Sequence, residues 1–228
     1  VAQGTHQHAM THLPRLLLCA TLATAALASS GCIPLAATGV AVGTMAALDR
    51  RTVGAQAEDE AIELKAANRV RSAGLQGRIS VASHNRRALI VGQVPDEATR
   101  QRAEQVVQGI ENVRGVHNEL QVGGRVSLTT QSSDTLITTK VKASYVDAKD
   151  LQVNTIKVVT ENGVVYLMGL LTQREAERAA QVASRVGGVQ RVVTVFELIS
   201  DEERVRLDRA QQSPTTPAPS PASPSGAR

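Results

Sequence analysis

The middle of the chain contains the same pattern of apolar and polar positions twice. Each copy opens with apolar residues spaced i, i+4 and i+8, which is the period of an amphipathic helix. Two segments of alternating apolar and polar residues follow, and in the second copy they meet at Asn162-Gly163, a pair that favours a hairpin turn. A second helical pattern and a third strand complete each copy. The sequence therefore predicts an α+β fold with two tandem αββαβ modules, each a three-stranded mixed sheet packed by two helices.

The two copies match at nearly constant offsets. Gly92 of the first copy corresponds to Gly169 of the second, 77 residues later. In the preceding helix, residues 69–71 resemble residues 140–142 at an offset of 71, which predicts six more residues between helix and strand in the second copy. Gly92 and Gly169 each interrupt a predicted strand, where a glycine marks the close approach of another backbone. We interpret both as structural glycines.

The helix between the second and third strands of copy two has a recognisable start. Thr172 and Glu175 match a capping box, which predicts the N-terminus of the helix. A third strand follows at residues 192–198, and we expect a right-handed crossover that makes it parallel to the second strand. The predicted buried stripe of this helix consists of Ala176, Ala179, Ala180, Ala183 and Val186.

Composition divides the chain into segments. We expect the first domain at residues 59–123, a linker at 124–133 and the second domain at 134–200. Residues 201–228 form a C-terminal extension. Its Pro/Ser-rich part, residues 213–228, has too few apolar residues to fold and is predicted to be disordered.

The N-terminal part has the pattern of a secretory signal peptide. An apolar run at residues 16–28 follows a basic residue and ends in small residues, and Met10 is the start that this pattern favours. The sequence Ser-Ser-Gly-Cys ending at Cys32 resembles a bacterial lipobox, although Ser29 stands where a lipobox usually carries leucine. The resemblance implies a signal peptide at residues 1–31 and acylation of Cys32 by palmitate-type chains.

Lipidation at Cys32 would make residues 32–58 a membrane tether. Ile33 follows the cysteine, and the absence of Asp at this place favours sorting to the outer membrane. The alternative is a single uncleaved membrane helix at residues 16–48, with Cys32 an ordinary thiol. Pro34 and two glycines interrupt that run and disfavour the helix.

Composition narrows the function classes. The 228 residues carry 25 Lys and Arg against 21 Asp and Glu, and only 1% are aromatic, with no Trp, which excludes stacking platforms for single-stranded nucleic acid. After signal cleavage, His84 and His117 are the remaining histidines, and no pattern specifies a metal site or a nucleophile. Residues 74–77 match the GxxG loop of nucleic-acid-binding KH domains, but secretion removes that ligand. We expect no enzyme activity, no metal, no cofactor and no nucleic acid partner.

Several segments resemble the BON domain, an αββαβ module of bacterial envelope proteins. They are RTVGAQ at 51–56, ITTKV at 137–141, VTENG at 159–163, MGL at 168–170 and ASRV at 183–186. The resemblance runs from about residue 32 to 199 and is to dual-BON lipoproteins of the outer membrane. It implies a lipid-anchored protein that faces the periplasm and supports outer-membrane integrity. It also implies anionic phospholipid, such as phosphatidylglycerol or cardiolipin, as a ligand of the second domain, localisation at the division site, and the β-barrel assembly machinery as a partner.

The first helix of the second copy, predicted at residues 135–147, has two distinct sides. Ile137, Val141 and Tyr145 cluster on the side that faces the core. The opposite side combines a mildly apolar stripe with flanking lysines, the composition of a helix that lies at a membrane interface. We therefore predict phospholipid binding at Leu136, Thr139, Lys140, Lys142, Ala143 and Val146.

Two alternatives stay open at this point. Leu136 could instead pack against the other domain, since single exposed leucines are common on protein surfaces. The protein could also be an interaction adaptor for the envelope assembly machinery, in which the sheets and the Pro-rich tail bind proteins and lipid contact is incidental.

Overall fold

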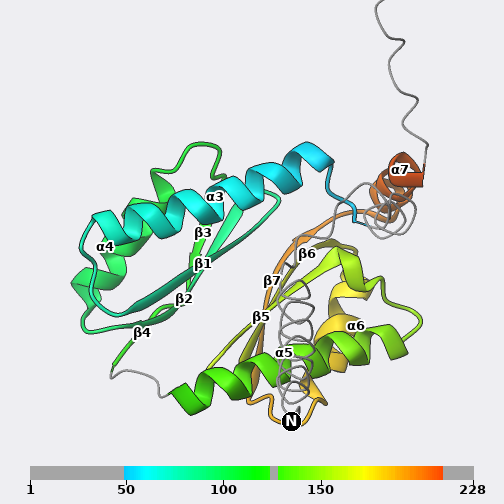
Figure 1. The fold of residues 1–228 in the computed structure, drawn as a ribbon. Helices are drawn as coiled ribbons and strands as arrows, with labels where there is room; N and C mark the ends of the chain where they lie inside the picture. Colours follow the sequence, from blue (N-terminus) through cyan, green and yellow to red (C-terminus); the bar gives the residue numbers. More distant parts are fainter. Residues whose placement is uncertain (1–48, 124–127, 213–228) are drawn as a thin grey trace, which may run out of the picture. The chain divides into compact units, whose positions relative to one another are not determined.

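The computed structural model describes residues 49–123 and 128–212, which belong to one compact unit (Figure 1). The predicted signal peptide, Cys32 and the Pro/Ser-rich segment lie outside the described residues. Of the helices in the described ranges, none has the length and apolar content needed to cross a bilayer.

The first domain packs two helices on one face of a mixed sheet. Helix α3 (Val53–Ser72) leads into the antiparallel pair β1 (Arg78–His84) and β2 (Arg87–Val94). Helix α4 (Glu97–Gln108) then returns the chain to β3 (Gly115–Asn118) and β4 (Gln121–Val122), which both pair parallel to β2. The third strand is therefore interrupted at residues 119–120, where Leu120 joins the domain core.

The second domain repeats this order with an unbroken third strand. Helix α5 (Leu128–Asp147) and the short 3-10 helix η1 (Val153–Thr155) precede β5 (Ile156–Glu161) and β6 (Val164–Leu171). Helix α6 (Gln173–Ser184) connects β6 to β7 (Arg191–Leu198), and β6 lies in the middle, antiparallel to β5 and parallel to β7. The predicted αββαβ order, the parallel crossover and the capping box of Thr172 and Glu175 are confirmed.

The helices differ from the sequence pattern at three places. Helix α3 begins at Val53, with the Thr52 side chain accepting a hydrogen bond from the Ala55 amide as its N-cap. Helix α5 begins at Leu128 rather than 135, so it includes the Ser/Thr-rich stretch expected as a linker. Helix α7 (Asp201–Gln212) occupies the start of the C-terminal extension. Ser and Thr cost a helix only fractions of a kcal/mol, roughly 0.5 each, so composition alone did not exclude these helical turns.

A buried aspartate on the first helix of each domain holds the hairpin turn. The two carboxylate oxygens of Asp59 accept hydrogen bonds from the backbone amides of Asn85 and Arg86, both at 2.7 Å. In the second domain, Asp134 accepts from Asn162 and Gly163, both at 2.8 Å. All four turn residues have positive φ, as a two-residue hairpin turn requires.

These aspartates correct the alignment of the two copies. Asp59 and Asp134 are 75 residues apart, as are the core residues Ile62 and Ile137. The offset of 71 predicted from residues 69–71 is therefore wrong by one helical turn, and the second copy has two extra residues before its first strand rather than six. Residues four apart share one helix face, so both registers give the same amphipathic pattern. The carboxylate that reaches the hairpin selects one of them.

In the second domain, α5 and α6 cover one face of the sheet. Ile137, Val141 and Tyr145 are buried there, as predicted, against the strands and the alanines of α6. The Tyr145 hydroxyl donates to the Ala179 carbonyl oxygen at 3.1 Å, so its polar group is satisfied inside the core. The small alanine side chains allow helix and sheet to approach closely.

The opposite faces of the two sheets contact each other and form a third apolar cluster. Residues that alternate with the helix-facing ones on β2 and β6 point to this side, because neighbouring strand residues face opposite ways. Strand β6 is consequently buried at every position from Val164 to Leu171. The cluster consists of Ala82, Leu89, Val91, Val164, Tyr166, Met168 and Val195.

Charged pairs between the domains surround this apolar cluster. Arg78 of the first domain pairs with Glu161 of the second, and burial raises the pKa of Glu161 although Arg78 opposes the shift. Arg87 Nε donates to a Glu197 carboxylate oxygen at 2.9 Å. Lys157 pairs with Glu63. Such pairs add specificity for one placement of the two sheets more than they add stability.

Arg50 connects the segment before α3 to the second domain. Its side chain is 2% exposed, and its guanidinium donates to both oxygens of Glu175, at 2.7 and 2.8 Å. It also donates to the Leu170 carbonyl oxygen at 2.8 Å and to Asp208 of α7 at 2.9 Å. This buried cation is therefore fully paired by the second domain and α7.

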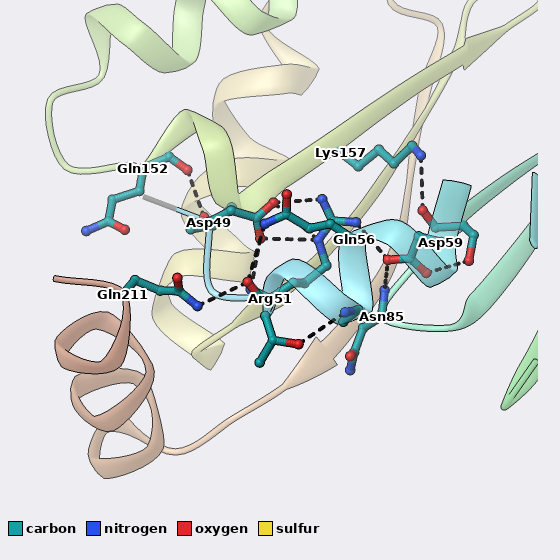
Figure 2. A network of polar contacts seen from close by, with 12 residues as sticks. Asp49, Arg51, Gln56, Asp59, Asn85, Gln152, Lys157 and Gln211 are labelled. Carbon is teal, nitrogen blue, oxygen red and sulfur yellow. Dashed lines mark hydrogen bonds and ion pairs between the residues drawn. The ribbon is translucent and has the colours of Figure 1, made fainter. Parts of the chain in front are cut away.

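Arg51 extends the network towards the first domain (Figure 2). Its guanidinium binds Asp49 and Asp59, each at 2.7 Å. The Gln211 side chain of α7 donates to the Arg51 carbonyl oxygen at 3.0 Å. Two consecutive arginines therefore join both domains and the C-terminal helix at one place.

The two predicted structural glycines lie where another backbone passes closely. A Cβ on Gly169 would be 2.6 Å from the Thr155 carbonyl oxygen. A Cβ on Gly92 would overlap the Arg78 carbonyl oxygen, and its φ of +126° also disfavours a side chain. Neither position has room for a larger residue unless the strand shifts.

We predict that Gly169→Val destabilises the protein by about 1–3 kcal/mol, because the side chain must displace the neighbouring backbone. Thermal unfolding followed by circular dichroism should show a melting temperature lowered by several degrees. Gly187→Ala is the matched control, since a Cβ at Gly187 meets no atom within 4 Å. Equal melting of Gly169→Val and the wild type would contradict the close approach.

Candidate functional site

Helix α5 carries all six predicted binding residues on its exposed side. Leu136 is 62% exposed and Val146 is 66% exposed. At this exposure, Leu136 is not buried against the first domain, which was its alternative interpretation. The other four, Thr139, Lys140, Lys142 and Ala143, are exposed as well.

Two shallow hollows flank this side of α5. One of about 450 Å³ lies between Leu136 and Lys140 and the loops of Asn162 and Gly188. The other, of about 640 Å³, lies between Lys140 and α6, where Arg178 and Arg185 contribute to its wall. Lys140 borders both hollows, so it lies at the centre of the candidate surface.

The charge of this surface is mainly positive. Lys140, Lys142 and Arg185 have no ion-pair partner among residues 49–123 and 128–212, whereas Arg178 binds Asp150 at 2.8 Å. Asp147 is the acidic residue that lines the second hollow. The arrangement suits a ligand that has an anionic group and apolar chains.

Arg178 and Arg185 also belong to this surface, although the sequence pattern did not predict it. They are seven residues apart around α6, a spacing that places two side chains on one side of a helix. That spacing was visible in the sequence, but only the packing of α6 beside α5 shows which surface the two arginines share.

The corresponding helix of the first domain differs at the same positions. With the offset of 75, Leu136 corresponds to Ala61 and Thr139 to Leu64, which is 66% exposed. Lys140 corresponds to Lys65, whose ammonium pairs with Glu111 at 3.4 Å. An exposed apolar side chain is thus present on both helices, but its neighbouring lysine has an acidic partner in the first domain.

His84 is buried at the domain contact rather than in a reactive site. It is the last residue of β1, is 5% exposed, and its Nε2 has no hydrogen-bond partner in the described part of the chain. Burial, together with the positive charge of Arg51, lowers its pKa to about 4. Across the described ranges, no cluster of three or more metal-ligating side chains occurs.

A family model of the BON domain matches residues 58–124 and 133–199. The matches cover more than half of the chain and coincide with the two αββαβ domains. The chain therefore belongs to the family of BON-domain proteins, and it has two such domains in tandem. Membership of this family makes it a non-enzymatic protein.

The chain is similar to several bacterial proteins, one of which is an outer membrane lipoprotein. The chain is 38% identical to outer membrane lipoprotein DolP of Haemophilus influenzae over 173 residues, which cover 74% of this chain and 89% of the relative. It is 34% identical to the 21 kDa hemolysin of Actinobacillus pleuropneumoniae over 155 residues, 67% of this chain and 80% of that protein. Osmotically-inducible protein Y of Escherichia coli is 31% identical over 117 residues, 50% and 58% of the two chains.

We predict that His84 makes the protein less stable in acid. Its pKa is about 4 in the folded state against an ordinary 6.5, so the unfolded state binds the proton first as pH falls. Stability is therefore lost between pH 6.5 and 4, with a slope of up to about 1.4 kcal/mol per pH unit from this one group. Urea unfolding of His84→Gln across this range should give a shallower pH dependence than the wild type.

His117→Gln is the control, since His117 is exposed. It controls for the replacement of an imidazole by an amide at a surface position. If His84→Gln and the wild type lose stability with the same slope, the buried imidazole does not contribute.

Proposed function

We propose that the protein is a lipoprotein of the outer membrane, faces the periplasm, and binds anionic phospholipid through the exposed side of α5 in its second BON domain. The observation that carries this proposal is the exposed apolar stripe beside Lys140 and Lys142, which have no acidic partner in the described part of the chain. Phosphatidylglycerol and cardiolipin are examples of ligands that combine the required charge and chains. Through this binding the protein supports outer-membrane integrity and gathers at the division site.

The magnitude of the interaction defines its role. A basic residue near an anionic membrane surface contributes about 1 kcal/mol. Two or three such residues with a few half-inserted apolar side chains give weak binding that depends on the salt concentration. The helix therefore selects which lipid is contacted, whereas the acyl anchor keeps the protein at the membrane.

The contrast between the domains supports assigning the ligand to the second one. In the first domain, Lys65 is paired with Glu111, and Arg69 donates to the Gly109 carbonyl oxygen at 2.6 Å. In the second domain, the lysines beside the apolar stripe remain available to a headgroup. The relative DolP is an outer membrane lipoprotein, which agrees with the predicted acylation of Cys32. The β-barrel assembly machinery is the protein partner that we propose at this membrane.

We predict that residues 49–228, which contain all three apolar clusters, sediment with anionic vesicles and not with neutral ones. Leu136→Glu should reduce this binding about tenfold or more, because it places an acidic group in the apolar stripe facing anionic headgroups. Leu64→Glu, at a similarly exposed leucine of the first domain, should bind like the wild type. Equal lack of binding to both kinds of vesicle would overturn the proposal and favour the protein-interaction adaptor.

We predict that radiolabelled palmitate enters the wild-type protein in bacteria and is absent from Cys32→Ala. The thioether at this residue is the attachment point that the lipobox implies. Label that persists in the Cys32→Ala protein would show that acylation occurs elsewhere in the chain.

A further inference from the structure

Strand β7 forms an edge of the second sheet. It pairs with β6 along its whole length, from Arg191 to Leu198, and no described strand pairs with its other side. A strand in this position presents a row of backbone amides and carbonyls that can pair with another strand.

The sequence of β7 lacks the usual protection of an edge. Residues 192–196 carry no charge and no proline, and all five are β-branched or aromatic. In the first domain the equivalent edge is divided into β3 and β4, and the interruption shortens the pairing surface. Natural proteins protect sheet edges by such interruptions, by charges or by proline. The second domain has kept a long and regular edge instead.

The side chains of β7 remain partly open to solvent. Thr194 is exposed, and Val192, Val193 and Phe196 are half-buried, whereas the neighbouring strand β6 is buried at every position. The sheet of the first domain and the helix α6 therefore cover the two faces of β7. The edge of β7 that points away from β6 stays available.

We propose that β7 pairs with β7 of a second copy of this chain, antiparallel and centred on Thr194. This inference does not depend on the lipid site, because α5 lies on a face of the sheet and not at its edge. Pairing about a two-fold axis at Thr194 joins the two sheets into one continuous sheet of six strands.

The pairs that this register creates between Arg191 and Glu197 are favourable. Arg191 comes opposite Glu197 of the second copy, and Val192 comes opposite Phe196 of the second copy. Val193 meets Val195 of the second copy, and the two Thr194 side chains meet at the axis. Opposite charges, aromatic with β-branched residues, and paired threonines are the combinations that stabilise neighbouring strands.

The charges favour a second copy over an unrelated strand. Arg191 and Glu197 are six residues apart, so both side chains point to the same face of the sheet. A two-fold axis at Thr194 therefore places Arg191 of each copy opposite Glu197 of the other copy, which gives two ion pairs per dimer. Glu197 also accepts hydrogen bonds from Arg87 at 2.9 Å and from Asn85 at 3.1 Å, but its side chain keeps 30% exposure, so a second cation can reach it.

Sedimentation equilibrium of residues 49–228 tests the pairing. The wild type should form a dimer that dissociates on dilution. Thr194→Lys should weaken dimerisation roughly tenfold or more, because it places two like charges directly opposite each other. Ser184→Lys adds the same charge at an exposed position of α6 and should not change the dimer. Since Thr194 is exposed, the Thr194→Lys monomer should unfold like the wild type.

A charge exchange tests the register. Arg191→Glu and Glu197→Arg should each weaken dimerisation, whereas an equimolar mixture of the two should form a mixed dimer, because the charges are again opposite. Each variant is checked for native circular dichroism first. A wild type that stays monomeric at every concentration overturns the proposal, and so does a dimer that Thr194→Lys leaves intact. A dimer that the charge exchange does not restore overturns the register.

Discussion

The contact between the two sheets is the constraint on which the rest of the structure depends. Strand β6 lies between the helices of its own domain and the sheet of the other domain, so none of its residues faces water. Tyr166 and Met168 point to the first domain, and Leu167 points to α5 and α6. Because each sheet uses both faces in this way, the surfaces left for ligands are the outer sides of the helices and the free sheet edges. The proposed lipid site and the proposed dimer contact are of these two kinds.

Segments outside the two BON matches complete this arrangement. Arg50 precedes the first match, and α7 follows the second. The Arg50 side chain nevertheless binds both Asp208 of α7 and Glu175 of the second domain. A buried arginine is costly unless its charge is paired, and here each contact comes from the second domain or α7. The chain that leads to the predicted anchor is therefore attached to the domain that we propose binds lipid, although the first domain comes next in sequence.

The two domains share their framework and differ on their surfaces. Asp59 and Asp134 hold equivalent hairpins, and Gly92 and Gly169 allow equivalent backbone contacts. The differences lie in the pairing of the lysines on the first helix and in the continuity of the third strand. A duplicated module must keep the groups that hold its turn and its close contacts, because each buried polar or steric mismatch destabilises it. Exposed positions carry a smaller penalty, so new functions arise there.

The sequence by itself determined the order of helices and strands, the hairpin at Asn162-Gly163, the capping box, and which side of α5 faces solvent. These follow from the periods of helix and strand and from turn and cap chemistry, which are properties of neighbouring residues. The uninterrupted apolar run of β6 also indicated that this strand is buried on both faces. A search for alternating apolar and polar residues does not detect such a strand. Only the tertiary structure decided the helix register, the sheet-to-sheet contact, the partners of Arg50, and the place of Arg185 beside α5. Each of these depends on groups that are distant in sequence, and local periodicity does not specify which distant surfaces meet.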